Sequence, residues 1–325
     1  MKRTVMAGLS VALLLAACSD DGSSSKDTNP AVGDVTVAID DTAPPITDDI
    51  PFEADAALTA AVQGAVDSAA PGCDPLDTRS CLLPFPSNVY TQQDPTSDTG
   101  LRVSLPPGSL PANESGAAIN VNEWNRNDGF SPNTPILAWF PDVDPEASKL
   151  PTWTDIGASL ADDSTIVLLD TDTGERVPLW AELDAHAADR VDRLLTIRPA
   201  ISLPEGHTFI VAIRGLVDIN GATIEATPTF QIYRDNLTTG IEEIEYRRGE
   251  MNNTLSTLTD AGIDRGSLQL AWTFTVASTR NISERMLHIR DESLAALGDV
   301  APAYTVTAVT PNSDDNIALQ VEGTY

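Results

Sequence analysis

Basic residues are scarce in this sequence. Its 325 residues include 19 Lys and Arg against 48 Asp and Glu, which gives a formal net charge of -29. Binding to nucleic acid requires a patch of Lys and Arg against the phosphates, so this balance argues against a nucleic-acid partner. The same excess of negative charge disfavours electrostatic docking on anionic lipid.

The N-terminal apolar run is too short to cross a bilayer, which takes about 20 residues. Residues 5–17 follow the cationic start Met-Lys-Arg and suit the hydrophobic region of a signal peptide. The run ends in Leu-Ala-Ala-Cys at 15–18, which resembles the bacterial lipobox. We therefore predict a lipoprotein signal peptide at 1–17 and a diacylglyceryl group on Cys18 that anchors an extracytoplasmic protein in the membrane. The alternative is an ordinary secretory signal with a chance cysteine.

Residues 18–52 have few apolar side chains. They are rich in Asp, Ser, Thr and Pro and bury too little apolar surface to offset the entropy of ordering, so we predict a disordered acidic tether. The spacing Ser23-x-x-Lys26 occurs in some acyl-serine enzymes, but in a tether it has no scaffold to hold it. Apolar residues at helical spacing then predict a short helix within 53–72.

Cysteine is limited to Cys18, Cys73 and Cys81. In an oxidising compartment the two thiols that remain after lipidation are expected to form a disulfide, Cys73 to Cys81. The closed loop is small, so the chain-entropy estimate is only about 2.5 kcal/mol. A metal site at these cysteines would need further His or Cys ligands nearby, which the sequence lacks, and we predict no metal and no cofactor.

Alternating apolar residues broken by turns indicate a mainly β fold, an Ig-like β-sandwich with two or three packed helices. The Ig-like core is expected at about 134–234. The strands predicted in the chain are 101–105, 136–140, 166–169, 177–181, 193–198, 208–213, 229–233, 268–276, 304–309 and 317–321.

Helical periodicity predicts helices at about 240–261 and 281–297. Gly262 is the expected stop of the first helix, and Asn281 or Ser283 the expected cap of the second. Residues 73–303 should form one β-rich domain. The terminal strands within 304–325 should lead towards an absent downstream domain, because no polar tail follows them.

No Gly-x-Ser-x-Gly nucleophile motif occurs in the chain. Ser159 and Ser131 lie in the nearest approximations, and neither has a strand, a turn and a helix around it. His186, His207 and His288 show no spacing that would bring one to a serine and a carboxylate. The segment Asp170-x-Asp172-x-Gly174 begins like a calcium loop but lacks the later ligands and fits a hairpin turn better. We assign no catalytic residue.

Several segments in order resemble the N-terminal region of bacterial virulence factor lipase-like secreted lipoproteins, with an SbsA-type Ig-like segment. They are Cys-Leu-Leu-Pro-Phe-Pro-Ser-Asn at 81–88, Gly-Leu-Arg-Val at 100–103, and the segments 194–199, 204–217 and 270–278. In that family a β-rich region precedes an α/β-hydrolase domain that carries Ser, Asp and His.

The resemblance implies the membrane-anchored, non-catalytic N-terminal module of a lipase- or esterase-like surface lipoprotein. Its partners would be the membrane, through the lipid on Cys18, and a hydrolase domain of the same parent chain. The alternative is a stand-alone cell-surface binding or structural lipoprotein with an Ig-like fold.

Overall fold

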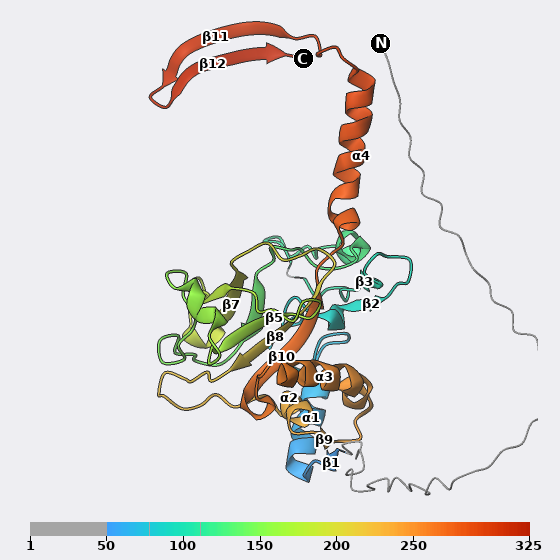
Figure 1. The fold of residues 1–325 in the computed structure, drawn as a ribbon, viewed down its shortest axis with the longest axis vertical. Helices are drawn as coiled ribbons and strands as arrows, with labels where there is room; N and C mark the ends of the chain where they lie inside the picture. Colours follow the sequence, from blue (N-terminus) through green and yellow to red (C-terminus); the bar gives the residue numbers. More distant parts are fainter. Residues whose placement is uncertain (1–50, 78, 111) are drawn as a thin grey trace, which may run out of the picture. The chain divides into compact units, whose positions relative to one another are not determined.

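The computed structural model describes residues 51–77, 79–110 and 112–325, and Figure 1 shows its helices and strands. The predicted signal peptide, Cys18, Ser23 and Lys26 lie outside these residues, as does nearly all of the predicted tether. The helices are α1 (Ala56–Ser68), α2 (Pro228–Arg234), α3 (Glu242–Asp260) and α4 (Thr279–Leu297). The strands are β1 (Phe52–Glu53), β2 (Thr91–Gln93), β3 (Leu101–Val103), β4 (Ile136–Trp139), β5 (Ile166–Asp170), β6 (Leu179–Leu183), β7 (Leu194–Pro199), β8 (Thr208–Arg214), β9 (Leu237–Thr238), β10 (Leu268–Thr275), β11 (Thr305–Asp314) and β12 (Ile317–Thr324). The fold is therefore mixed, with strands in several small sheets beside helices.

The central sheet is antiparallel with strand order β10-β8-β5, and these strands run side by side in Figure 1. Its register places Leu168 opposite Val211 and Val211 opposite Trp272. All three side chains are at most 1% exposed. Both faces of this sheet are largely covered, which explains why the sequences of β5 and β8 read as nearly continuous apolar runs.

A second antiparallel sheet has the order β4-β7-β6. The chain leaves β5 through the turn that begins at Asp170, where the Gly174 N–H donates to the Asp170 carbonyl at 2.8 Å. The returning arm pairs briefly with β5 through Arg176 opposite Leu169, and then joins the second sheet as β6. The predicted hairpin turn is confirmed, but its two strands belong to different sheets.

Helices α1, α2 and α3 are in contact in sequence order, and α3 also contacts β8 and β10. Helix α3 buries Ile244, Met251, Leu255 and Leu258. Gly262, with φ of +80°, follows its end as predicted, because glycine tolerates the left-handed region. These contacts fix α3 beside the central sheet.

One predicted strand is wrong: residues 229–233 lie in helix α2. Thr227 caps the helix by accepting a hydrogen bond from the Phe230 N–H at 3.3 Å, and Pro228 occupies the first turn, where its missing N–H costs nothing. Phe230 and Ile232 are fully buried. Aromatic and β-branched side chains such as these favour a strand, but the Thr227 cap and Pro228 in the first turn favour a helix, and the segment is helical.

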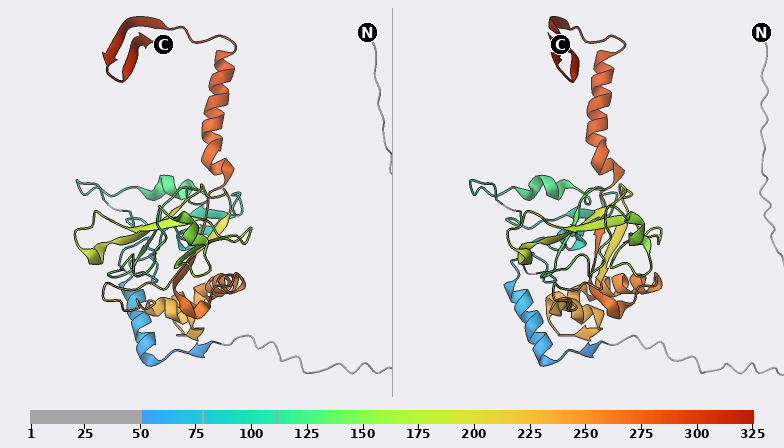
Figure 2. Two further views of the ribbon diagram at one scale, coloured as in Figure 1. Left: turned by 60° about the vertical axis from the view of Figure 1, so that its left-hand side comes forward. Right: turned by 90° about the vertical axis from the view of Figure 1, so that its left-hand side faces the viewer.

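Helix α4 begins one turn earlier than its predicted cap implies. Ser278 is the cap and accepts from the Asn281 N–H at 3.1 Å, so neither Asn281 nor Ser283 caps the helix. No residue of α4 is buried, which differs from the packing expected for this helix. Figure 2 shows α4 as one unbroken helix.

Strands β11 and β12 form a two-stranded antiparallel hairpin with Val309 opposite Val321. All its side chains are exposed, including Ile317, Leu319 and Val321, which alternate along one face of β12.

In the part of the chain that the structure describes, no helix is both long and apolar enough to cross a membrane.

Candidate functional site

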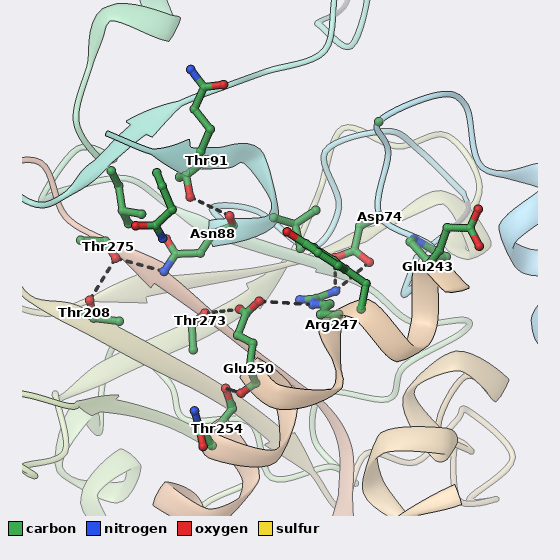
Figure 3. A pocket seen from close by; sticks show the side chains of 18 of the residues that line it. Asp74, Asn88, Thr91, Thr208, Glu243, Arg247, Glu250, Thr254, Thr273 and Thr275 are labelled. Carbon is green, nitrogen blue, oxygen red and sulfur yellow. Dashed lines mark hydrogen bonds and ion pairs between the residues drawn. The ribbon is translucent and has the colours of Figure 1, made fainter. Parts of the chain in front are cut away.

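The predicted cysteine pair forms a disulfide, with 5.0 Å between the Cα atoms of Cys73 and Cys81. The loop that it closes lies at one side of an open groove of about 1370 Å³. The other walls of the groove come from the end of α1, from β2 and β3, from the ends of β8 and β10, and from α3. Figure 3 shows this groove and ten of its side chains by name.

A buried ion pair joins the disulfide loop to α3. Both carboxylate oxygens of Asp74 accept from Arg247 Nη1, at 3.0 and 2.9 Å (Figure 3). Asp74 is fully buried. Burial opposes the guanidinium charge, but Asp74 and Glu250 outweigh it and keep the pKa of Arg247 above its usual value. Nε and Nη2 of Arg247 are buried and donate no hydrogen bond to the described residues.

Tyr90 also holds the disulfide loop, through its hydroxyl group. Its hydroxyl accepts from the Asp74 N–H at 3.2 Å and from the Leu82 N–H at 3.1 Å. Burial raises the pKa of Tyr90, so this phenol stays protonated and neutral. The position of Asp74 is thus fixed by the disulfide, by Tyr90 and by Arg247 together.

The ends of the central strands supply a row of hydroxyl groups. Asn88 Nδ2 donates to Thr275 Oγ1 at 3.0 Å, and Thr275 Oγ1 lies 3.0 Å from Thr208 Oγ1 on the neighbouring strand (Figure 3). Thr273 donates to Glu250 Oε1 at 3.0 Å, and Glu250 Oε2 lies 3.9 Å from Arg247 Nε. Thr273 and Thr275 alternate with core residues along β10, so the pleat turns their side chains to the groove.

The polar lining of the groove consists mostly of hydroxyl, amide and carboxylate groups. Eight threonines and the amides of Asn88, Gln92, Gln93 and Asn253 line it, with the carboxylates of Asp74, Glu243 and Glu250. Arg247 is the one cation among the described residues of the lining, and Asp74 neutralises it. No described lining residue is Ser, His or Lys, so the groove presents no pairing of serine with histidine for acyl transfer.

Ser159 and Ser131, the serines in the nearest approximations to the nucleophile motif, form hydrogen bonds with nearby backbone groups. Ser159 is buried, donates to the Ile156 carbonyl at 2.7 Å and accepts from the Leu179 N–H at 3.0 Å. Ser131 is exposed and its Oγ accepts from the Asn133 N–H at 3.4 Å. Neither hydroxyl has a histidine partner among the described residues.

The three histidines lie apart in the fold. His186 is exposed in a loop, and His288 lies on α4, 3.4 Å from Glu292. His207 differs, because its Nδ1 lies 2.9 Å from Asp170 Oδ2 at the turn after β5. The structure thereby adds an imidazole to the Asp-x-Asp segment, an association across 37 residues that the spacing in sequence does not show.

Sequence reasoning missed Asp74, Arg247 and Glu250, although one signal was available. Arg247 follows Ile244 by three residues and precedes Met251 by four, so it shares the buried stripe of α3. An arginine on an apolar stripe requires a carboxylate partner, and the disulfide loop contains two aspartates. The pairing with Asp74 in particular depends on tertiary packing.

Searches of family models, of curated proteins and of solved structures each returned no match to this chain.

Proposed function

We propose that this chain is the membrane-anchored, non-catalytic N-terminal module of a lipase- or esterase-like surface lipoprotein, and that its groove binds a polar ligand. The groove lining carries this proposal: it is rich in hydroxyl, amide and carboxylate groups, and none of its described residues is a serine or a histidine. The lipobox at Cys18 and the ordered resemblance to lipase-like lipoproteins support the anchor and the parent family. We also propose that the β core, at about 134–234, has an Ig-like arrangement.

The ligand that suits this lining is a polyhydroxylated molecule, neutral or amine-bearing, such as an oligosaccharide. Threonine hydroxyls and amides both donate and accept hydrogen bonds, as sugar hydroxyls do. Glu243 and Glu250 add negative charge that disfavours anions. Tyr246, which is 93% exposed at the groove, offers a ring face for stacking on a sugar.

A steric block of the groove tests this function. Asn253 lines the groove and Ser256 does not, and both are exposed on α3. On an array of neutral and amine-bearing oligosaccharides, the parent chain and Ser256→Trp should bind the same sugars, whereas Asn253→Trp should lose them. Equal binding by both variants, or no binding by the parent, would contradict the proposal. All three should leave nitrophenyl esters unhydrolysed above the level of heat-treated protein.

Exposed apolar side chains favour an accessory module over a stand-alone protein. Met286 and Leu294 on α4, with Val309 and Leu319 on the hairpin, are 53–67% exposed. A two-stranded hairpin is only marginally stable alone in water, so burial against a hydrolase domain would stabilise it. A reading frame that continues past Tyr325 into a Gly-x-Ser-x-Gly motif would support this choice. A stop codon there would favour the stand-alone surface protein.

A further inference from the structure

We propose that Asp170, Asp172 and His207 form a binding site for a divalent transition metal, of which Zn²⁺ is the best match. Each residue offers one ligand atom, and these atoms lie within 4.8 Å of one another. None of the three residues lines the groove, although their neighbours Thr171 and Thr208 do. The metal site does not rest on the function proposed for the groove. Asp170 ends β5, Asp172 lies in the turn that follows, and His207 immediately precedes β8.

The charge balance at this place calls for a cation. Asp170 is buried, with 4% of its surface exposed, and Asp172 stands two residues away. Among the described residues neither carboxylate forms an ion pair with Lys or Arg, and His207 is the sole ion-pair partner of Asp170. A buried carboxylate that no Lys or Arg neutralises is costly, and a metal ion beside it supplies positive charge.

Hydrogen bonds and packing already orient the ligands. Asp170 Oδ1 accepts from the Asp172 N–H at 2.9 Å, and Asp172 Oδ2 accepts from the Thr208 N–H at 3.1 Å. The His207 ring stacks on Phe209, with 6.5 Å between centroids and 25° between the ring planes. Such supporting contacts are typical of metal sites, where they fix the direction of the ligand side chains.

The ligand types select the metal. Calcium takes oxygen ligands, whereas imidazole together with carboxylates suits zinc and its neighbours. Ligand atoms about 2.1 Å from a tetrahedral ion are about 3.4 Å apart. Ligand atoms as far apart as the 4.8 Å limit would therefore have to close by about 1.4 Å, which the exposed Asp172 side chain allows.

Zinc titration by calorimetry tests the site on the full chain without a histidine tag, with Cys18→Ser in every protein so that no free thiol competes. We expect one Zn²⁺ per chain at this site and no comparable heat with Ca²⁺. His207→Ala and Asp172→Asn should each weaken Zn²⁺ binding at least about tenfold. Asp172→Asn keeps an oxygen for the Thr208 N–H, so its effect reports on the metal rather than on the turn. Melting curves without metal should show that both variants fold.

The other two histidines are matched controls. His186→Ala should leave Zn²⁺ affinity unchanged, and so should His288→Ala, although His288 and Glu292 form an exposed pair one helical turn apart. Three results would each overturn the proposal: no stoichiometric Zn²⁺ binding, full affinity in His207→Ala, or loss of binding in His288→Ala. The last would show an adventitious surface site on α4.

Discussion

Two aspartates in the disulfide loop have opposite electrostatic environments. Asp74 is fully buried but shares both oxygens with Arg247. Asp77 is also buried, and desolvation, with a smaller contribution from the negative charge of Asp74, raises its pKa from the usual 3.8 to about 6. A short loop thus holds one carboxylate that is stabilised by its partner and one that is destabilised by burial.

Asp77→Asn should stabilise the protein at neutral pH but not in acid. The pKa of Asp77 is higher in the folded state than in the unfolded chain, so the folded state binds this proton more tightly. The resulting contribution to the free energy of unfolding is fully present below about pH 4 and is lost as the pH rises through about 6. The shift from 3.8 to about 6 corresponds to at most about 3 kcal/mol at pH 7.5. Urea unfolding at pH 4 and pH 7.5 measures the effect. An equal change at both pH values would contradict the assignment.

Arg247→Met should destabilise the fold by about 3 to 5 kcal/mol, because it leaves the buried Asp74 carboxylate without a cation. Combining it with Asp74→Asn should recover part of the loss. Urea unfolding of both single variants and of the double variant measures the coupling. Arg280→Met is the control, since Arg280 pairs with Glu284 at the surface, and its effect should be much smaller than that of Arg247→Met. Strictly additive losses for Asp74 and Arg247 would rule out the pair.

Element boundaries depend on individual capping groups. Ser278 begins α4 by accepting from the Asn281 N–H, and its hydroxyl also donates to Asp128 Oδ2 at 2.6 Å. Asp128 is buried and accepts from the Ser278 N–H as well, at 3.0 Å. The start of α4 is therefore bound to the loop around Asp128, although the rest of the helix buries nothing.

Ser278→Ala should reduce the free energy of unfolding by about 1 to 2 kcal/mol, because the helix loses its cap and Asp128 loses a donor. Ser283→Ala is the matched control on the same helix. Its exposed hydroxyl donates only to the Thr279 carbonyl, and the change should stay within about 0.5 kcal/mol. Urea unfolding followed by far-UV circular dichroism compares them. A larger effect at Ser283 would mean that the cap lies there instead.

At the scale of the whole molecule, the proposed anchor and the folded region are separate parts of the chain. The lipobox-like sequence predicts a lipid on Cys18, whereas contacts within the described residues, among them the Cys73 to Cys81 bridge, hold the folded region together. Loss of the lipid should therefore change where the protein resides and leave its fold intact.

Cys18→Ala should move the protein from the detergent phase to the aqueous phase in a partitioning experiment, since stable anchoring requires acyl chains in the bilayer. The near-UV circular dichroism and the melting temperature should match those of the parent. Partitioning into detergent that is unchanged in Cys18→Ala would refute the lipid anchor.

The sequence by itself determined the features that depend on neighbouring residues. Apolar runs located β5, β8 and β10, because a strand covered on both faces requires them. A helical stripe followed by Gly262 located α3 and its end. Two cysteines eight residues apart, together with the oxidising compartment that a signal peptide implies, predicted their bridge. In α2 the apolar pattern was ambiguous, and the proline and the cap at its start decided the outcome.

Only the tertiary structure decided which distant groups meet. Asp74 and Arg247 are 173 residues apart, and His207 and Asp170 are 37 apart. Local periodicity shows which face of an element is buried, but the partner on that face depends on how the elements pack. The groove, its row of hydroxyls and the Asp170, Asp172 and His207 cluster arise at the ends of packed strands, where residues from separate segments of the chain come together.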